Sequence, residues 1–180
     1  IASSLALLAM TNMAWAHHIP TVTDRPDTAE ASVTVGRNHL QMETSFGFRQ
    51  NTEGAETTRI YSFPTLLRFG LIDWLEFRME GEMVAVRTET GAATRRGFTD
   101  LAFGLKSHLL KNNGWVPSLG LLAHVNTPTG KNSLSANAAE PIFKILADWG
   151  LPGDFSLGTN VGFDVPARDT SGRKPARLLY

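Results

Sequence analysis

The stretch LEFRMEGE, residues 75–82, decides the fold, because Leu75, Phe77 and Met79 alternate in it with charged residues. Successive side chains of a β-strand point to opposite faces, so this stretch has one apolar face and one ionic face. Charged side chains need water or ionic partners. The same alternation recurs along most of the chain. It predicts an all-β fold, an antiparallel up-and-down transmembrane β-barrel with lipid outside and a wet interior.

Composition narrows the class of protein. The chain has 180 residues, a net charge of +0, no cysteine and 42% hydrophobic residues. This is the bulk of one domain, and no basic excess points to a nucleic-acid partner. The absence of cysteine excludes a disulfide framework and a Cys-ligated metal. No segment after the start reaches the roughly 18 to 20 apolar residues of a spanning helix, so any membrane crossing would use strands.

The two ends of the sequence predict a partial, exported protein. Residues 1–16 are uncharged, mostly apolar and end in Ala-Trp-Ala, which is typical of a signal peptide, although a buried N-terminal helix is the alternative. We expect residues 17–30 to be a periplasmic lead and 31–180 a partial barrel. The missing basic start before residue 1 and the short run 174–180, which resembles the beginning of an eighth strand, indicate a fragment with further hairpins.

Seven alternating stretches predict strands at residues 39–50, 58–69, 75–86, 98–110, 115–127, 143–149 and 155–165. Pro64 cannot donate to a strand ladder and therefore requires a bulge, and a phase reversal near residues 37–38 requires another irregularity. Short turns at 70–73, 111–114 and 150–154 alternate with longer polar connections at 51–57, 87–97, 128–140 and 166–177. This asymmetry is typical of outer-membrane barrels, with turns in the periplasm and loops outside the cell.

Tryptophans mark the short turns. Trp74, Trp115 and Trp149 each adjoin one of the three turns. Tryptophan prefers the level where acyl chains meet headgroups, so these residues predict a periplasmic aromatic girdle against outer-membrane lipid. In the alternative, they close the end of a soluble barrel.

Polar residues with inward phase are the candidate lumen lining. Charges of both signs on neighbouring strands can pair across the ladder. Taken singly, each is best interpreted as part of a salt-bridge lattice that fills the barrel, whereas as a group they could set the selectivity of a pore. The set is Glu43, Arg49, Arg68, Glu76, Arg78, Glu80, Glu82, Asp100, Lys106, His108, His124, Lys144, Asp148 and Asn160.

Motifs for catalysis are weak. Carboxylates two positions apart on one strand lie about 7 Å apart, too far to share a proton unaided. His108 and His124 have inward phase on adjacent predicted strands, but no third metal ligand accompanies them. The run PTGKNS, residues 128–133, lacks the first glycine and the Lys-Ser/Thr adjacency of a phosphate loop. We therefore expect no enzyme, no cofactor and no metal site.

Several short motifs occur in an order that resembles a known family. They are TDRP at 23–26, FPTLLRFGL at 63–71, LEFR at 75–78, TDLAFGLK at 99–106, PSLG at 117–120, TPTG at 127–130 and NVG at 160–162. Together they resemble the family of proposed outer-membrane transporters labelled "MetA-pathway of phenol degradation". The resemblance implies a Gram-negative outer-membrane barrel that transports small compounds, aromatic ones among them. It implies no catalytic residues.

Three hypotheses follow from the sequence. The first is an outer-membrane channel whose inward charges decide which small solutes pass. The second is a non-transporting outer-membrane barrel, either a scaffold or an enzyme, with a filled lumen. The third is a secreted soluble β-barrel that binds an apolar ligand and therefore has the opposite polarity, with apolar residues inside. Alternation is symmetric, so it leaves open which face is the interior.

Overall fold

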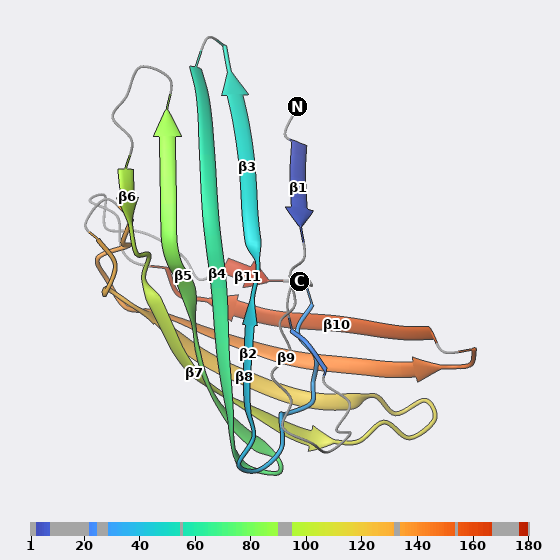
Figure 1. The fold of residues 1–180 in the computed structure, drawn as a ribbon. Helices are drawn as coiled ribbons and strands as arrows, with labels where there is room; N and C mark the ends of the chain where they lie inside the picture. Colours follow the sequence, from blue (N-terminus) through green and yellow to red (C-terminus); the bar gives the residue numbers. More distant parts are fainter. Residues whose placement is uncertain are drawn as a thin grey trace.

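The protein forms one curled antiparallel sheet. The computed structural model describes residues 3–7, 22–24, 29–54, 56–89, 95–131, 134–153, 155–166 and 177–179. Every helix or strand assigned within these ranges is a strand, and the sheet curls into a half-barrel (Figure 1). The same residues include no helix of the length and apolar character that crossing a membrane would require.

The strands follow one another around the sheet in nearly sequential order. The order is β1-β3-β4-β5-β7-β8-β9-β10-β11, while β2 pairs with β4 and β6 pairs with β5. Their bounds are β1 Ser3–Leu7, β2 Leu40–Thr44, β3 Phe46–Glu53, β4 Glu56–Ile72, β5 Leu75–Glu89, β6 Arg95–Gly97, β7 Leu101–Leu110, β8 Ser118–Thr127, β9 Glu140–Leu151, β10 Phe155–Asp164 and β11 Arg177–Leu179. Antiparallel neighbours of this kind are the pattern that the alternation predicts.

The first predicted strand is divided in the structure. It breaks at Ser45 into β2 and β3, which pair with the two halves of β4. The bulge predicted at Pro64 is confirmed by a register shift between Ser62 and Pro64. The predicted irregularity near residue 38 is a turn, in which Asn38 has a φ of 59° and donates its backbone N–H to the Gly70 carbonyl at 2.8 Å.

The connections agree only in part with the prediction. The prediction of a long connection at 51–57 is wrong, because β3 and β4 pair as far as Glu53 and Glu56. Most residues of this stretch are polar. When both faces of a strand meet water, the sequence shows no alternation of apolar and polar residues by which the strand could be predicted. Residues 90–94 and 167–176, within two other predicted loops, lie outside the described residues.

The ends of the sheet involve the two ends of the sequence. β11 pairs with β10 through Gly162 and Leu179, where the start of an eighth strand was expected. β1 pairs with β3 and lies within the predicted signal peptide. The signal peptide itself stays a prediction.

The two faces of the sheet differ sharply in polarity and exposure. Apolar side chains such as Leu40, Ile145 and Phe155 are exposed by 70%, 55% and 71%. On the opposite face, Glu76 and Lys106 are fully buried. That face is covered by residues 22–24 and 29–38, which we call the N-terminal segment.

Candidate functional site

The N-terminal segment is bound to the charged face by hydrogen bonds along its length. Ser32 donates its hydroxyl to Ser118 on β8 at 2.7 Å, and its backbone N–H donates to Asp148 on β9 at 2.5 Å. The Val35 N–H donates to Glu76 on β5 at 2.9 Å. The segment therefore runs across several strands rather than extending the sheet as one more strand.

The side chain of Glu30 shows that the charged face is the concave one. Its carboxylate lies 3.0 Å from Arg78 on β5 and 2.8 Å from Lys144 on β9. With its amide oriented to satisfy both groups, Asn160 on β10 pairs with the Glu30 backbone N–H and carbonyl. β5 and β10 are four positions apart in the sheet, about 19 Å if it were flat. Their convergence on one residue places Glu30 in the hollow.

Arg68 links two wall carboxylates beneath the N-terminal segment. Its Nε and Nη2 donate to the two oxygens of Glu76 at 2.9 and 3.0 Å, a bidentate geometry. Its Nη1 donates to Glu43 at 3.2 Å and to the Val22 carbonyl at 2.9 Å. Because the guanidinium is only 1% exposed, these bonds replace its hydration.

Asp24 lies at the centre of the cluster. One carboxylate oxygen accepts from Arg78 Nη1 at 2.5 Å and from Lys106 Nζ at 2.7 Å, and lies 3.6 Å from Arg68. The Asp24 backbone N–H donates to Glu43 at 2.9 Å. Burial by itself raises the pKa of the Asp24 carboxyl, but the charges of Lys106, Arg68 and Arg78 together hold the pKa below its ordinary value. Asp24 is therefore ionised at neutral pH.

Two histidines extend the polar face on either side of this cluster. His124 Nδ1 on β8 lies 2.9 Å from Glu80 on β5. His108 Nδ1 lies 3.1 Å from the Ser32 carbonyl in the N-terminal segment. The two histidines thus have different partners and do not form a common site.

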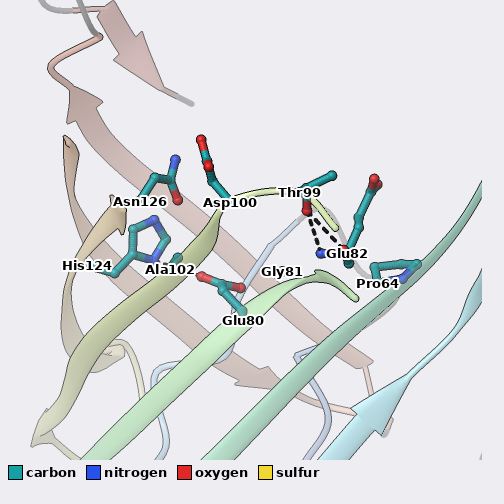
Figure 2. A pocket seen from close by; sticks show the side chains of 9 residues that line it. All are labelled: Pro64, Glu80, Gly81, Glu82, Thr99, Asp100, Ala102, His124 and Asn126. Carbon is teal, nitrogen blue, oxygen red and sulfur yellow. Dashed lines mark hydrogen bonds and ion pairs between the residues drawn. The ribbon is translucent and has the colours of Figure 1, made fainter. Parts of the chain in front are cut away.

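A recess of about 310 Å³ opens beside Glu80 and His124. Figure 2 shows its lining, which consists of Pro64, Glu80, Gly81, Glu82, Thr99, Asp100, Ala102, His124 and Asn126. Asp100 accepts backbone hydrogen bonds from Gly130 at 2.8 Å and Ala136 at 2.7 Å, so its carboxylate organises a loop. Partial burial raises the pKa of Asp100, whereas hydrogen bonds from Ser135 and these backbone groups lower it below the ordinary value.

The predicted lumen residues fall into three groups. Glu43, Arg68, Glu76, Arg78 and Lys106 meet in the buried cluster. Six others contact the N-terminal segment or one another around that cluster, namely Glu80, His108, His124, Lys144, Asp148 and Asn160. Glu82 and Asp100 lie apart from the cluster at the recess, and Arg49 is exposed on β3.

The girdle tryptophans lie beside the short turns. Trp74 and Trp115 are exposed by 54% and 93%. Trp149 donates its ring N–H to the Trp115 carbonyl at 3.0 Å, so two of the three are adjacent. Whether lipid surrounds them stays a prediction.

Sequence reasoning did not single out Asp24 and Glu30. Both lie in a segment without strand periodicity, and Asp24 is 82 positions from its partner Lys106. The one available signal was the TDRP motif, which carried part of the family resemblance but gave no role to its aspartate. Only the known fold shows that the strands bring more cations than anions into the buried cluster, so that a further carboxylate is required there.

The chemistry of this cluster is that of an ionic lattice. Its carboxylates are each hydrogen-bonded to cations or backbone N–H groups, which fixes side chains and keeps charges paired. Within the described ranges, no group of three or more His, Asp or Glu side chains is arranged to hold a metal ion. The third hypothesis needs a hollow lined mainly by apolar side chains. In the described sheet the exposed apolar side chains lie on the convex face, and the hollow face combines the ionic cluster with four buried apolar residues, Leu66, Ala102, Leu122 and Leu146.

The described residues form a half-barrel with an exposed apolar exterior and a hollow that holds the N-terminal segment and its ionic partners, which defines the class as an antiparallel all-β protein. A family model described as "Putative MetA-pathway of phenol degradation" matches residues 23–177. The chain belongs to this family, which confirms the resemblance seen in the sequence. Searches of curated proteins and of solved structures found no match.

Proposed function

We propose that this chain forms part of the wall of a β-barrel in a Gram-negative outer membrane, and that a signal peptide directs its export. The barrel conducts small compounds, aromatic ones among them. One observation carries the proposal: the face rich in leucine and phenylalanine is exposed while the charged face is buried. In water this arrangement would be unfavourable, since each buried charge loses hydration and each exposed apolar group remains hydrated. Lipid outside the sheet removes the second cost.

The exposed apolar residues come from strands all around the sheet. Met42 on β2, Phe77 on β5 and Leu105 on β7 are exposed by 55%, 38% and 46%, and further members follow on β8 to β10. A contiguous apolar surface of this extent marks an interaction with lipid or with another protein. Outer-membrane lipid is the partner we propose, with the three tryptophans at its periplasmic boundary.

The ionic hollow supplies the proposed selectivity. In this proposal solutes pass along the ionic face, whose paired charges on β4, β5 and β7 lie beneath the N-terminal segment, because charged linings select solutes in channels. The family description names a phenol-degradation pathway, which supports aromatic solutes as the first to test. The chemistry of the cluster favours conduction over catalysis, and the proposal includes no cofactor and no nucleic acid.

The experiment tests membrane insertion and conduction separately. The natural full-length protein should fractionate with the outer membrane, migrate on gels in a heat-modifiable way, and make liposomes permeable to phenol-sized solutes. An Ile145→Arg variant places a charge on the apolar face and should insert less well by about 2 to 4 kcal/mol if that residue lies at the membrane midplane. The matched control, Arg49→Lys, keeps its charge at an exposed position. Release of the native protein in aqueous buffer would refute the proposal.

A non-transporting barrel is the second candidate. It is favoured by the N-terminal segment, which fills the hollow between β4 and β10 with buried hydrogen bonds and ion pairs. Membrane insertion without permeability to any solute would select this candidate.

A further inference from the structure

The carboxylate of Asp24 occupies a site built by cations of the wall. Arg78 and Lys106 stand on the neighbouring strands β5 and β7, and both place a nitrogen on the same Asp24 oxygen, at 2.5 and 2.7 Å. Both side chains are almost completely buried, at 1% and 0% exposure. A buried pair of cations around one carboxylate is the arrangement by which proteins bind carboxylate ligands.

The wall does not neutralise these two cations closely. Glu76 is engaged by Arg68 in a bidentate pair and lies 3.5 Å from both Arg78 and Lys106. Glu80 is 4.0 Å from Arg78. Among the described residues, the carboxylates within about 3 Å of Arg78 or Lys106 are Asp24 and Glu30. Both belong to the N-terminal segment.

Charge counting gives the same result. Within the buried cluster the strands contribute three cations, Arg68, Arg78 and Lys106, and two anions, Glu43 and Glu76. Asp24 supplies the third anion. Without Asp24, this cluster would carry one excess positive charge and would attract an anion.

Arg78 also keeps an unused donor. Its Nε–H is buried and has no hydrogen-bond partner in the described part of the chain. A guanidinium binds a free carboxylate side-on through its parallel Nε–H and Nη2–H groups, but Asp24 is held by Nη1 and Glu30 lies 3.0 Å from Nη2. When the N-terminal segment withdraws, both carboxylates leave, and a free carboxylate can approach Nε and Nη2 together.

We infer that Asp24 is an internal substitute for a ligand, and that Arg78 and Lys106 form a binding site for a small organic carboxylate, which enters when the N-terminal segment withdraws. This inference rests on the proposed channel function, because it names the class of solute that the hollow recognises. The tethered carboxylate and the free ligand compete for the same two cations. The apparent affinity for the free ligand is therefore its intrinsic affinity multiplied by the fraction of molecules in which Asp24 has left the site.

The test is equilibrium dialysis of benzoate against the natural full-length protein in detergent at low salt. Asp24→Asn removes the competing charge while keeping its shape, and should bind benzoate at least tenfold more tightly than the native protein. Adding Lys106→Met to Asp24→Asn should abolish that gain. The matched control Glu53→Gln removes one negative charge from an exposed position at the end of β3, away from the N-terminal segment, and should leave the affinity unchanged.

Two related compounds provide the specificity control. Benzylamine and benzyl alcohol carry the same ring with a positive charge or none, and neither should gain affinity in Asp24→Asn. Equal gains for benzylamine, an unchanged affinity for benzoate, or a gain that survives Lys106→Met would each overturn the inference.

A second measurement is independent of the folding of Asp24→Asn. The 180 residues contain no cysteine, so Thr23→Cys places the one thiol among them next to Asp24. Benzoate should increase its rate of labelling by a water-soluble thiol reagent several-fold at constant ionic strength, and benzylamine should not. An unchanged rate at saturating benzoate would overturn the inference.

Liposome permeability, measured on the same variants, separates this inference from the proposed function. Tight, Asp24-sensitive benzoate binding without permeability would refute the channel and leave the binding site. Permeability without such binding would refute the site and leave the channel.

Discussion

Replacement of Glu76 by glutamine tests the ionic cluster most directly. The Glu76 carboxylate is fully buried, and it accepts hydrogen bonds from Arg68 Nε and Nη2 and from the Val35 N–H, each at 2.9 to 3.0 Å. It also lies 3.5 Å from Arg78 and from Lys106. Glutamine has one acceptor oxygen in place of two, so at least one of these bonds is lost. Three buried cations would then face one negative charge fewer.

The expected loss of stability follows from that geometry. Removal of one partner from a buried ion pair costs about 3 to 5 kcal/mol. With a urea dependence of about 1 to 3 kcal/mol per molar, the unfolding midpoint should fall by at least about 1 M. The assay is urea unfolding of the full-length protein in lipid vesicles, followed by tryptophan fluorescence.

A matched variant controls for the chemical change. Glu82→Gln makes the same substitution on the same strand, but at a half-buried position beside the recess, and should cost less than about 1 kcal/mol. A loss below about 1 kcal/mol for Glu76→Gln, or equal losses for the two variants, would refute the reasoning.

Two further predictions concern the N-terminal segment. A Cβ added at Gly120 would lie 2.7 Å from the Ser32 carbonyl oxygen, so Gly120→Ala should destabilise the fold by about 1 to 3 kcal/mol in urea unfolding. The control Gly150→Ala should not, because its Cβ meets only Asn112 at 3.4 Å. Equal unfolding midpoints for the two variants would contradict this packing. Asp24 has a folded-state pKa below its ordinary value of 3.8, so its ion pairs stabilise the protein fully above that value and are lost as the pH falls through the folded pKa. The difference in unfolding free energy between the native protein and Asp24→Asn should therefore be constant above about pH 5 and shrink below about pH 4; a difference unchanged down to pH 2 would contradict this assignment.

Much of the sheet could be predicted from alternation alone. The strands at 58–69, 75–86 and 155–165 correspond to β4, β5 and β10, and the predicted bulge at Pro64 is present because proline lacks the N–H of a ladder. The errors occur where local polarity misleads. Residues 51–57 are polar on both faces and were assigned to a loop, although β3 and β4 pair through most of that stretch.

Only part of the candidate site could be predicted from the sequence. Glu43, Arg68, Glu76, Arg78 and Lys106 share the inward phase of their strands, so their gathering on one face follows from the period of two. Asp24, which joins three of them, lies in a segment with no period. Its contacts with Arg78 and Lys106 span 54 and 82 positions, a separation at which local patterns carry no information.

The sequence by itself determined that the chain makes antiparallel strands with one apolar and one ionic face, because side-chain direction alternates along any strand. Only the tertiary structure decided that the ionic face is the hollow one and that the N-terminal segment fills it. Alternation is the same whichever face turns inward, whereas curvature brings Glu30 within reach of β5, β9 and β10 at once. The physical reason is that buried cations require carboxylates, and here two of those carboxylates come from outside the strands.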